Sequence, residues 1–210
     1  MAVAPLRLFG VAMTDNGHGD ALAEGTETIT FRDMAAVVGL APAARADRTD
    51  ASLAQYQEII DTVFSRVSLL PAPAGVVFRS RDVILRWMEL HYVTLHEALA
   101  FVDNRVAARV HVSRTIDTAE TLSETTEVAS DIAAIASGSF RVLRRHAVAS
   151  VPLKSSEQGL TASAAFLVDR DRWPLFADVV REEDRRLADL TYHLTGPWPP
   201  YDFVRMQFGG

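Results

Sequence analysis

The chain has 210 residues, of which 49% are hydrophobic and 23% are charged. These fractions are typical of a folded globular protein and exclude a disordered chain or a bundle of membrane helices. The 27 acidic and 21 basic residues give a net charge of −6, the wrong sign for a protein that neutralises nucleic-acid phosphates. The lack of cysteine excludes disulfides, thiolate metal sites and a cysteine nucleophile.

The N-terminal sequence MAVAPLRLFGVAM does not resemble a targeting segment, because Arg7 interrupts its apolar run. No stretch of the sequence reaches the roughly 18 apolar residues of a membrane-spanning helix. The lack of cysteine also suits the reducing cytoplasm. We therefore expect a cytoplasmic protein that is neither secreted nor inserted into a membrane.

Three strands are predicted at the start of the chain. The apolar run of residues 6–13 predicts the first strand, which ends at the turn signal Asp15-Asn16-Gly17. Two shorter strands are expected over residues 28–31 and 34–38. The Ala/Pro/Arg-rich stretch that follows them is expected to be a loop.

Two helices are predicted next. From Asp50, a suitable N-cap, apolar residues recur at spacings of three and four and predict a helix that Pro71 terminates. A short strand is expected over residues 75–78. Ser80 is then expected to cap a second helix, which continues to Asp103-Asn104.

The second half of the chain predicts the order strand, helix, strand, strand, helix, strand, which is the ferredoxin-like order. These elements are expected, in chain order, over residues 106–112, 119–135, 140–151, 160–168, 173–187 and 190–194. The tripeptide Ser137-Gly138-Ser139 is interpreted as the end of the first of these helices. Residues 201–208 predict one extra strand.

The sequence thus predicts an α+β protein of two domains that meet at Asp103-Asn104. Residues 1–103 form an N-terminal α+β domain in this interpretation. Residues 104–210 form a C-terminal modified ferredoxin-like domain, with the order β-α-β-β-α-β plus the extra strand.

No catalytic or metal-binding motif emerges. Gly17-His18-Gly19 lacks the third glycine of a dinucleotide fingerprint, and Lys154, the one lysine, does not lie in a phosphate-binding loop. His91 and His96 are five residues apart, so on a helix they point about 140° apart and cannot hold one ion together. We expect no enzyme activity, no cofactor and no metal site; an enzyme that uses scattered carboxylates and arginines is a weaker alternative.

The segment LTGPWPPYDFV, residues 194–204, has three prolines within four residues and is expected to be a stiff connection flanked by aromatic side chains. Trp198 and Tyr201 are expected to close the end of the C-terminal domain core, to form an exposed anchor of the kind that dominates binding hot spots, or to do both. We name Trp198, Tyr201 and Phe203 as the candidate partner-binding residues.

This segment resembles the C-terminal signature of the gas vesicle protein L/F family (GvpL/GvpF). The similarity extends through the sequence AFLV at 165–168, through SLLPAPAGVVF at 68–78, and to the opening LRLFGV at 6–11, which is similar to the family's first strand. Residues 114–126 match no part of the family pattern.

The resemblance implies a two-domain α+β protein with a C-terminal domain of modified ferredoxin type. It also implies a non-enzymatic accessory or minor structural role in gas vesicle assembly, with the small hydrophobic shell protein as partner and other gas vesicle accessory proteins as further candidates. The shell protein would be captured on apolar surface or by strand addition at a sheet edge.

One alternative of a different class stays open. A ferredoxin-like regulatory protein would bind a small ligand in the cleft between its two domains. The sequence does not decide between monomer and oligomer, or which surface binds the shell protein.

Overall fold

The computed structural model describes residues 4–14, 22–41, 49–114, 125–154, 161–187 and 190–204. The chain divides into two compact units, and the second is one continuous stretch, residues 104–198. The first unit consists of residues 1–103 together with 199–210. The sequence division placed 199–210 with the second half, whereas the structure groups this segment with the first unit.

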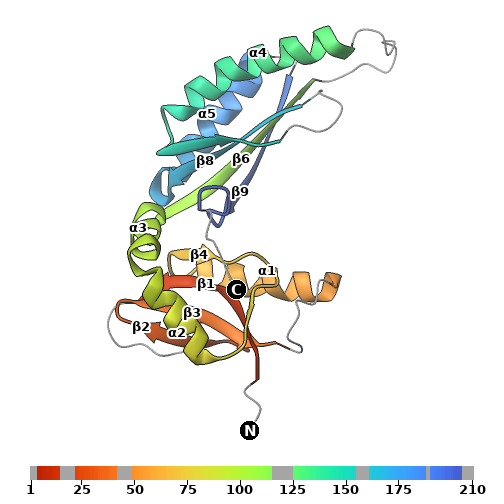
Figure 1. The fold of residues 1–210 in the computed structure, drawn as a ribbon. Helices are drawn as coiled ribbons and strands as arrows, with labels where there is room; N and C mark the ends of the chain where they lie inside the picture. Colours follow the sequence, from red (N-terminus) through yellow and green to blue (C-terminus); the bar gives the residue numbers. More distant parts are fainter. Residues whose placement is uncertain are drawn as a thin grey trace. The chain divides into compact units, whose positions relative to one another are not determined.

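The first unit contains an antiparallel sheet with the strand order β2-β3-β1-β4, and a further short strand, β5, also pairs with β1 (Figure 1). The strands are β1 (Leu6–Met13), β2 (Glu27–Phe31), β3 (Met34–Leu40), β4 (Leu69–Pro71) and β5 (Val77–Phe78). Strand β4 was not expected from the sequence. It lies close to β1 because Gly10 has no side chain, and a Cβ at that position would lie 2.6 Å from the Leu70 carbonyl oxygen.

Helices cover both faces of this sheet. The helices of the first unit are α1 (Asp50–Phe64), α2 (Arg81–Leu90) and α3 (Tyr92–Val102). Helices α2 and α3 contribute Ile84 and Leu99 to the core cluster that also contains Leu8, whereas Tyr56 of α1 stacks on Phe9, which points to the opposite face. Seven of the eight residues of β1 are buried as a result, Arg7 among them, which explains why every other residue of the strand is apolar or glycine.

Three expected helix boundaries of the first unit differ from the structure. Helix α1 ends at Phe64, well before Pro71, which was expected to terminate it. Thr49, and not Asp50, is the N-cap of α1, since its side chain accepts a hydrogen bond from the Ser52 backbone N–H at 3.4 Å. Ser80 caps α2 as predicted. The single long helix expected from Ser80 to Asp103 is wrong, because His91 adopts φ −107° and ψ 13° and separates α2 from α3.

The second unit contains an antiparallel sheet with the strand order β7-β8-β6-β9. Its elements follow the chain as β6 (Arg105–Arg114), α4 (Thr125–Arg144), β7 (Ala149–Pro152), β8 (Thr161–Asp169), the short 3-10 helix η1 (Arg170–Arg172), α5 (Trp173–Arg186) and β9 (Leu190–Trp198). Both α4 and α5 pack on the same face of this sheet (Figure 1). Phe166 of β8 contacts Phe140 of α4 and Phe176 of α5, with ring centroids 5.9 and 5.4 Å apart.

Helix α4 continues past its expected end. It passes through Gly138 and ends at Arg144, so the strand expected from residue 140 is wrong and β7 begins only at Ala149. Ser139 is fully buried, and its hydroxyl lies 2.7 Å from that of Tyr192 on β9. Ser139, a polar residue within α4, thus has a hydrogen-bond partner on another element of the fold.

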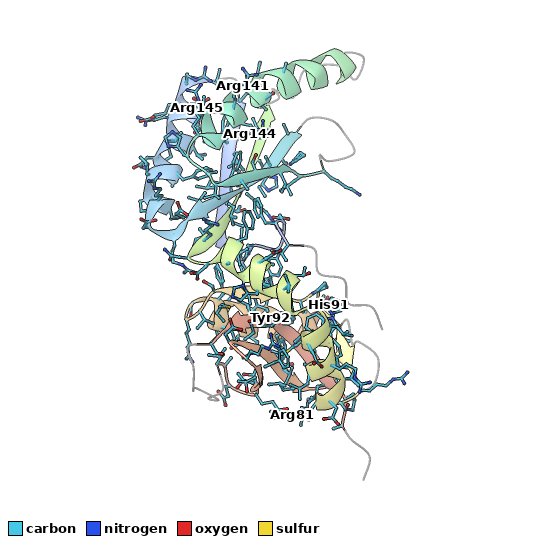
Figure 2. The ribbon with its side chains drawn as sticks, turned by 60° about the vertical axis from the view of Figure 1, so that its left-hand side comes forward. Arg81, His91, Tyr92, Arg141, Arg144 and Arg145 are labelled. Carbon is cyan, nitrogen blue, oxygen red and sulfur yellow. The ribbon has the colours of Figure 1, made fainter. Side chains whose placement is uncertain are left out.

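The last turn of α4 is rich in arginine. Arg141, Arg144 and Arg145 lie at this end of the helix (Figure 2), where positive charge is favoured by the helix dipole. The guanidinium of Arg144 also donates a hydrogen bond to the Ser150 hydroxyl at 3.0 Å.

The extra C-terminal strand is not present where the structure describes the chain. Residues 201–203 form a turn, and residues 205–208 lie outside the described residues, as does the turn signal at 15–17. None of the helices within the described ranges has the length and apolar character needed to cross a lipid bilayer.

Candidate partner-binding segment

Trp198 is the last residue of β9, the strand at one edge of the second unit's sheet. Its side chain is 36% exposed, and its indole N–H donates a hydrogen bond to the Thr195 hydroxyl at 3.1 Å. Large aromatic side chains that stay partly exposed and are held by a hydrogen bond at one end are typical of interface anchors. Trp198 is therefore partly exposed, and its role as an anchor stays a prediction.

The backbone before Trp198 makes a kink that requires glycine. The pairing between β6 and β9 shifts register between Ala107 and Arg109, and the Gly196-Pro197 peptide bond is cis. Gly196 has φ +126°, and a Cβ there would lie 2.8 Å from the Ala107 carbonyl oxygen. The kink places Trp198 opposite Ala107 at the end of the ladder.

Tyr201 has a different environment, in the first unit. Its backbone N–H donates a hydrogen bond to the Pro199 carbonyl at 2.8 Å, which closes a turn. Its hydroxyl is buried beside the Tyr56 hydroxyl of α1, and this burial, together with the Tyr56 hydroxyl, raises the pKa of Tyr201 far above its usual value. Tyr201 is therefore packed, but in the first unit and not in the C-terminal domain core where its packing role was expected.

Phe203 is half-buried and belongs to the same turn, since its N–H donates to the Pro200 carbonyl at 3.1 Å. The next residue, Val204, packs against the core cluster of the first unit. The three candidate residues are thus divided between two packed bodies, with Trp198 in the second unit and Tyr201 and Phe203 in the first.

Sequence reasoning missed two exposed apolar side chains at the junction of α2 and α3. Leu90 is 75% exposed and Val93 is 65% exposed, on either side of His91 and Tyr92 (Figure 2). Both residues lie outside the apolar stripe of the predicted helix, which contains Ile84, Trp87, Leu95 and Leu99. Apolar residues out of phase with the buried stripe were the signal that could have identified them.

The two histidines of this region contact different partners, and they do not lie on one continuous helix, because His91 separates α2 from α3. The Nδ1 atom of His91 lies 2.8 Å from the Trp87 carbonyl oxygen, whereas Nε2 of His96 lies 3.3 Å from a carboxylate oxygen of Asp33. The Tyr92 hydroxyl donates to the same carboxylate at 3.0 Å. Within the described ranges, no three His, Asp or Glu side chains gather in a metal-binding arrangement.

Comparison with protein families identifies the chain. The model of the family described as gas vesicle synthesis protein GvpL/GvpF matches residues 8–138 and 123–205. The chain belongs to the GvpL/GvpF family. This finding confirms the resemblance drawn from the proline-aromatic segment and the first strand. The matched ranges also include residues 114–126, where the sequence analysis found no similarity.

Two relatives match the GvpL/GvpF chain over most of its length. Gas vesicle protein F2 of Halobacterium salinarum is 26% identical over 197 residues, which cover 92% of this chain and 87% of that protein. Gas vesicle protein F1 of the same organism is 22% identical over 200 residues, which cover 91% and 87%. Together with the family match, these relatives support a gas-vesicle-related role.

Two crystal structures share the fold. That of the gas vesicle protein GvpF from Anabaena sp. PCC7120 matches with a TM-score of 0.82 at 15% identity, over 99% of this chain and 98% of that one. That of GvpF from Microcystis aeruginosa matches with a TM-score of 0.75 at 14% identity, over 97% and 100%. The mixed α+β fold with two antiparallel sheets is therefore the GvpF fold.

Proposed function

We propose that this protein is an accessory or minor structural protein of gas vesicles, which binds the small hydrophobic shell protein and assists assembly. Membership of the GvpL/GvpF family supports a role in gas vesicles. The observation that carries the binding step is the partly exposed Trp198 at the end of β9. The strand order β7-β8-β6-β9 with both helices on one face supports a ferredoxin-like class for the second unit.

The surroundings of β9 favour capture by an apolar surface over strand addition. In the described part of the sheet no strand pairs with the outer edge of β9. However, the Leu190 N–H donates to the Leu187 carbonyl at 2.9 Å, and the Tyr192 N–H donates to the Asp184 carboxylate at 2.8 Å. Backbone donors that are already occupied cannot pair with a new strand. The binding step therefore depends on side chains at the Trp198 end of β9.

We expect Trp198→Ala to weaken capture of a co-expressed gas vesicle shell protein by about tenfold or more, because a buried aromatic anchor dominates the binding energy of an interface. The measurement is pull-down of the complex followed by size analysis, with circular dichroism to show that the variant remains folded. Leu53→Ala is the matched control, since Leu53 is a similarly exposed apolar residue of α1 in the first unit.

The two possible failures are distinguishable. If the unaltered protein captures no shell protein and leaves its aggregation unchanged, the proposed function is wrong. If Trp198→Ala captures as much as Leu53→Ala, the function stands and Trp198 is not the anchor.

A further inference from the structure

The first unit contains a pocket of about 380 Å³ that neither the family resemblance nor the proposed function uses. It is lined by residues from β1, β3, β5 and α1, including Phe9, Gly39, Ser52 and Gln55. Arg7 is the one charged residue among the described residues of its lining. A pocket of this volume lies within the usual range for sites that bind small molecules.

Arg7 is a buried cation on the central strand, with only 8% of its surface exposed. Its guanidinium donates to the Ser52 hydroxyl at 2.9 Å and to the Ser52 carbonyl at 3.4 Å. It lies 5.5 and 5.4 Å from the ring centroids of Phe9 and Tyr56. These contacts hold the side chain in place on several sides.

Arg7 has no counter-charge in the part of the chain that the structure describes. Among the described residues no carboxylate forms an ion pair with it, and its buried Nε–H has no hydrogen-bond partner. Buried charges in proteins are normally paired, because desolvation of an unpaired ion is strongly unfavourable. In a chain of net charge −6, a buried arginine with no acidic partner among the described residues favours an anionic ligand as its counter-charge.

The first turn of α1 adds to the positive character of the pocket. Thr49, Ala51 and Ser52 all line it, and the N-terminal turn of a 15-residue helix carries partial positive charge that favours anions. The carboxylate of Asp50 belongs to the same turn, but Asp50 does not line the pocket. The remaining wall is largely apolar and includes Ile59.

We propose that this pocket binds a small organic anion, with its carboxylate or phosphate group at Arg7 and the first turn of α1 and its apolar part against Phe9 and Ile59. The two oxyanion groups share the chemistry that recognises a guanidinium and a helix N-terminus. The site lies wholly within the first unit and is independent of Trp198.

The test is a titration of the full-length protein, followed by nuclear magnetic resonance, with four probes. Benzoate and phenyl phosphate carry the two oxyanion groups on an apolar body, inorganic phosphate lacks the body, and benzamide lacks the charge. We expect one of the aryl anions to bind at least about tenfold more tightly than benzamide, since a charge-assisted pair requires the negative charge. Equal affinity for benzamide and both aryl anions, or no binding of either aryl anion at millimolar concentration, overturns the proposal.

Substitutions of residues that line the pocket test whether the aryl anion binds there. Arg7→Gln is expected to abolish binding of the aryl anion, but it alters a core residue and is informative only if the variant folds. Gln55→Glu avoids this difficulty, because Gln55 is exposed on α1 at the pocket and the substitution changes charge with little change of shape. It is expected to weaken binding about fivefold through repulsion of the anion.

Ala54→Glu is the matched control for Gln55→Glu. Ala54 is the neighbouring exposed residue of α1 and does not line the pocket, so the same charge on the same helix is expected to leave the affinity nearly unchanged. If the two variants weaken binding equally, the anion does not bind at this pocket and the proposal fails. None of these outcomes affects the shell-protein proposal, whose readout is capture through Trp198.

Discussion

At the residue scale, side chains that look alike in the sequence have unlike surroundings in the structure. Trp198 and Tyr201 are three residues apart, yet the indole is partly exposed at the end of a sheet while the phenol hydroxyl is buried beside another tyrosine. The three prolines make this segment stiff, but they do not determine which of its side chains are buried. Arg7 is a further example, because this charged residue of β1 is buried and lines a pocket.

Tyr56 makes a residue-scale prediction for alkaline pH. Its hydroxyl donates to the Ala72 carbonyl, and burial raises its pKa from 10.0 to about 12. Because the unfolded chain releases this proton first, the stabilising contribution is complete below pH 10 and is lost as pH rises from 10 to about 12. The free energy of unfolding should fall over that window by about 2 kcal/mol from this group.

The measurement is urea unfolding as a function of pH, with ultraviolet absorbance to follow phenolate formation. Tyr56→Phe is expected to be less stable at neutral pH and to show a smaller decline above pH 10. An equally steep decline in Tyr56→Phe would contradict the assignment to this residue.

At the element scale, tertiary contacts extend or interrupt helices that local sequence signals describe differently. Gly138 resembles a helix terminator, but α4 passes through it because Phe140 and Ser139 find partners on β8 and β9. The helix expected from Ser80 is interrupted at His91 instead. Glycine and short polar residues lower helix propensity by amounts that packing readily exceeds.

Substitution of two glycines tests this description of the elements. Gly138→Ala should stabilise the protein by about 0.5–1 kcal/mol, since no atom lies within 4 Å of the new Cβ and alanine favours a helix interior. Gly196→Ala should destabilise it by about 2 kcal/mol or more, because the new Cβ would meet the Ala107 carbonyl at a φ of +126°. Denaturant midpoints measure both effects. A loss of stability in Gly138→Ala would show that α4 ends at residue 138 after all.

At the scale of the whole molecule, the first unit is assembled from two parts of the chain that are far apart in sequence. Residues 199–204 belong with residues 1–103, and Tyr201 and Val204 pack against α1 and the core cluster of that unit. The second unit is continuous in sequence. The C-terminal segment therefore has a structural task in the first unit, separate from any role of Trp198 in binding.

Truncation after Trp198 should lower the stability of the first unit in particular, because it removes the contacts of Tyr201 and Val204. We expect backbone amides of β1 and α1 to exchange hydrogen faster, with a loss of about 1–3 kcal/mol. This is less than the roughly 3–5 kcal/mol for a fully buried aromatic side chain, because Tyr201 is only half-buried. Hydrogen exchange followed by mass spectrometry separates the two units. Tyr201→Ala in the full-length chain is the control and should give a smaller change in the same strands. If β6 and β8 lose protection in place of β1 and α1, the assignment of the segment is wrong.

The sequence by itself determined the features that depend on neighbouring residues. The strand over residues 6–13, the existence of a helix from Asp50 and the Ser80 cap follow from apolar periodicity and local hydrogen bonding. The proline-aromatic segment was enough to indicate the GvpL/GvpF family, which the family match confirmed.

Only the tertiary structure decided features that depend on residues distant in sequence. The interruption at His91, the continuation of α4 through Gly138 and the grouping of residues 199–204 with the first unit arise from packing between elements. The pocket around Arg7 brings together β1, β3 and α1, which are separated by tens of residues. Local patterns specify which face of an element is apolar, but the partner that covers that face is set by the packing of the whole core.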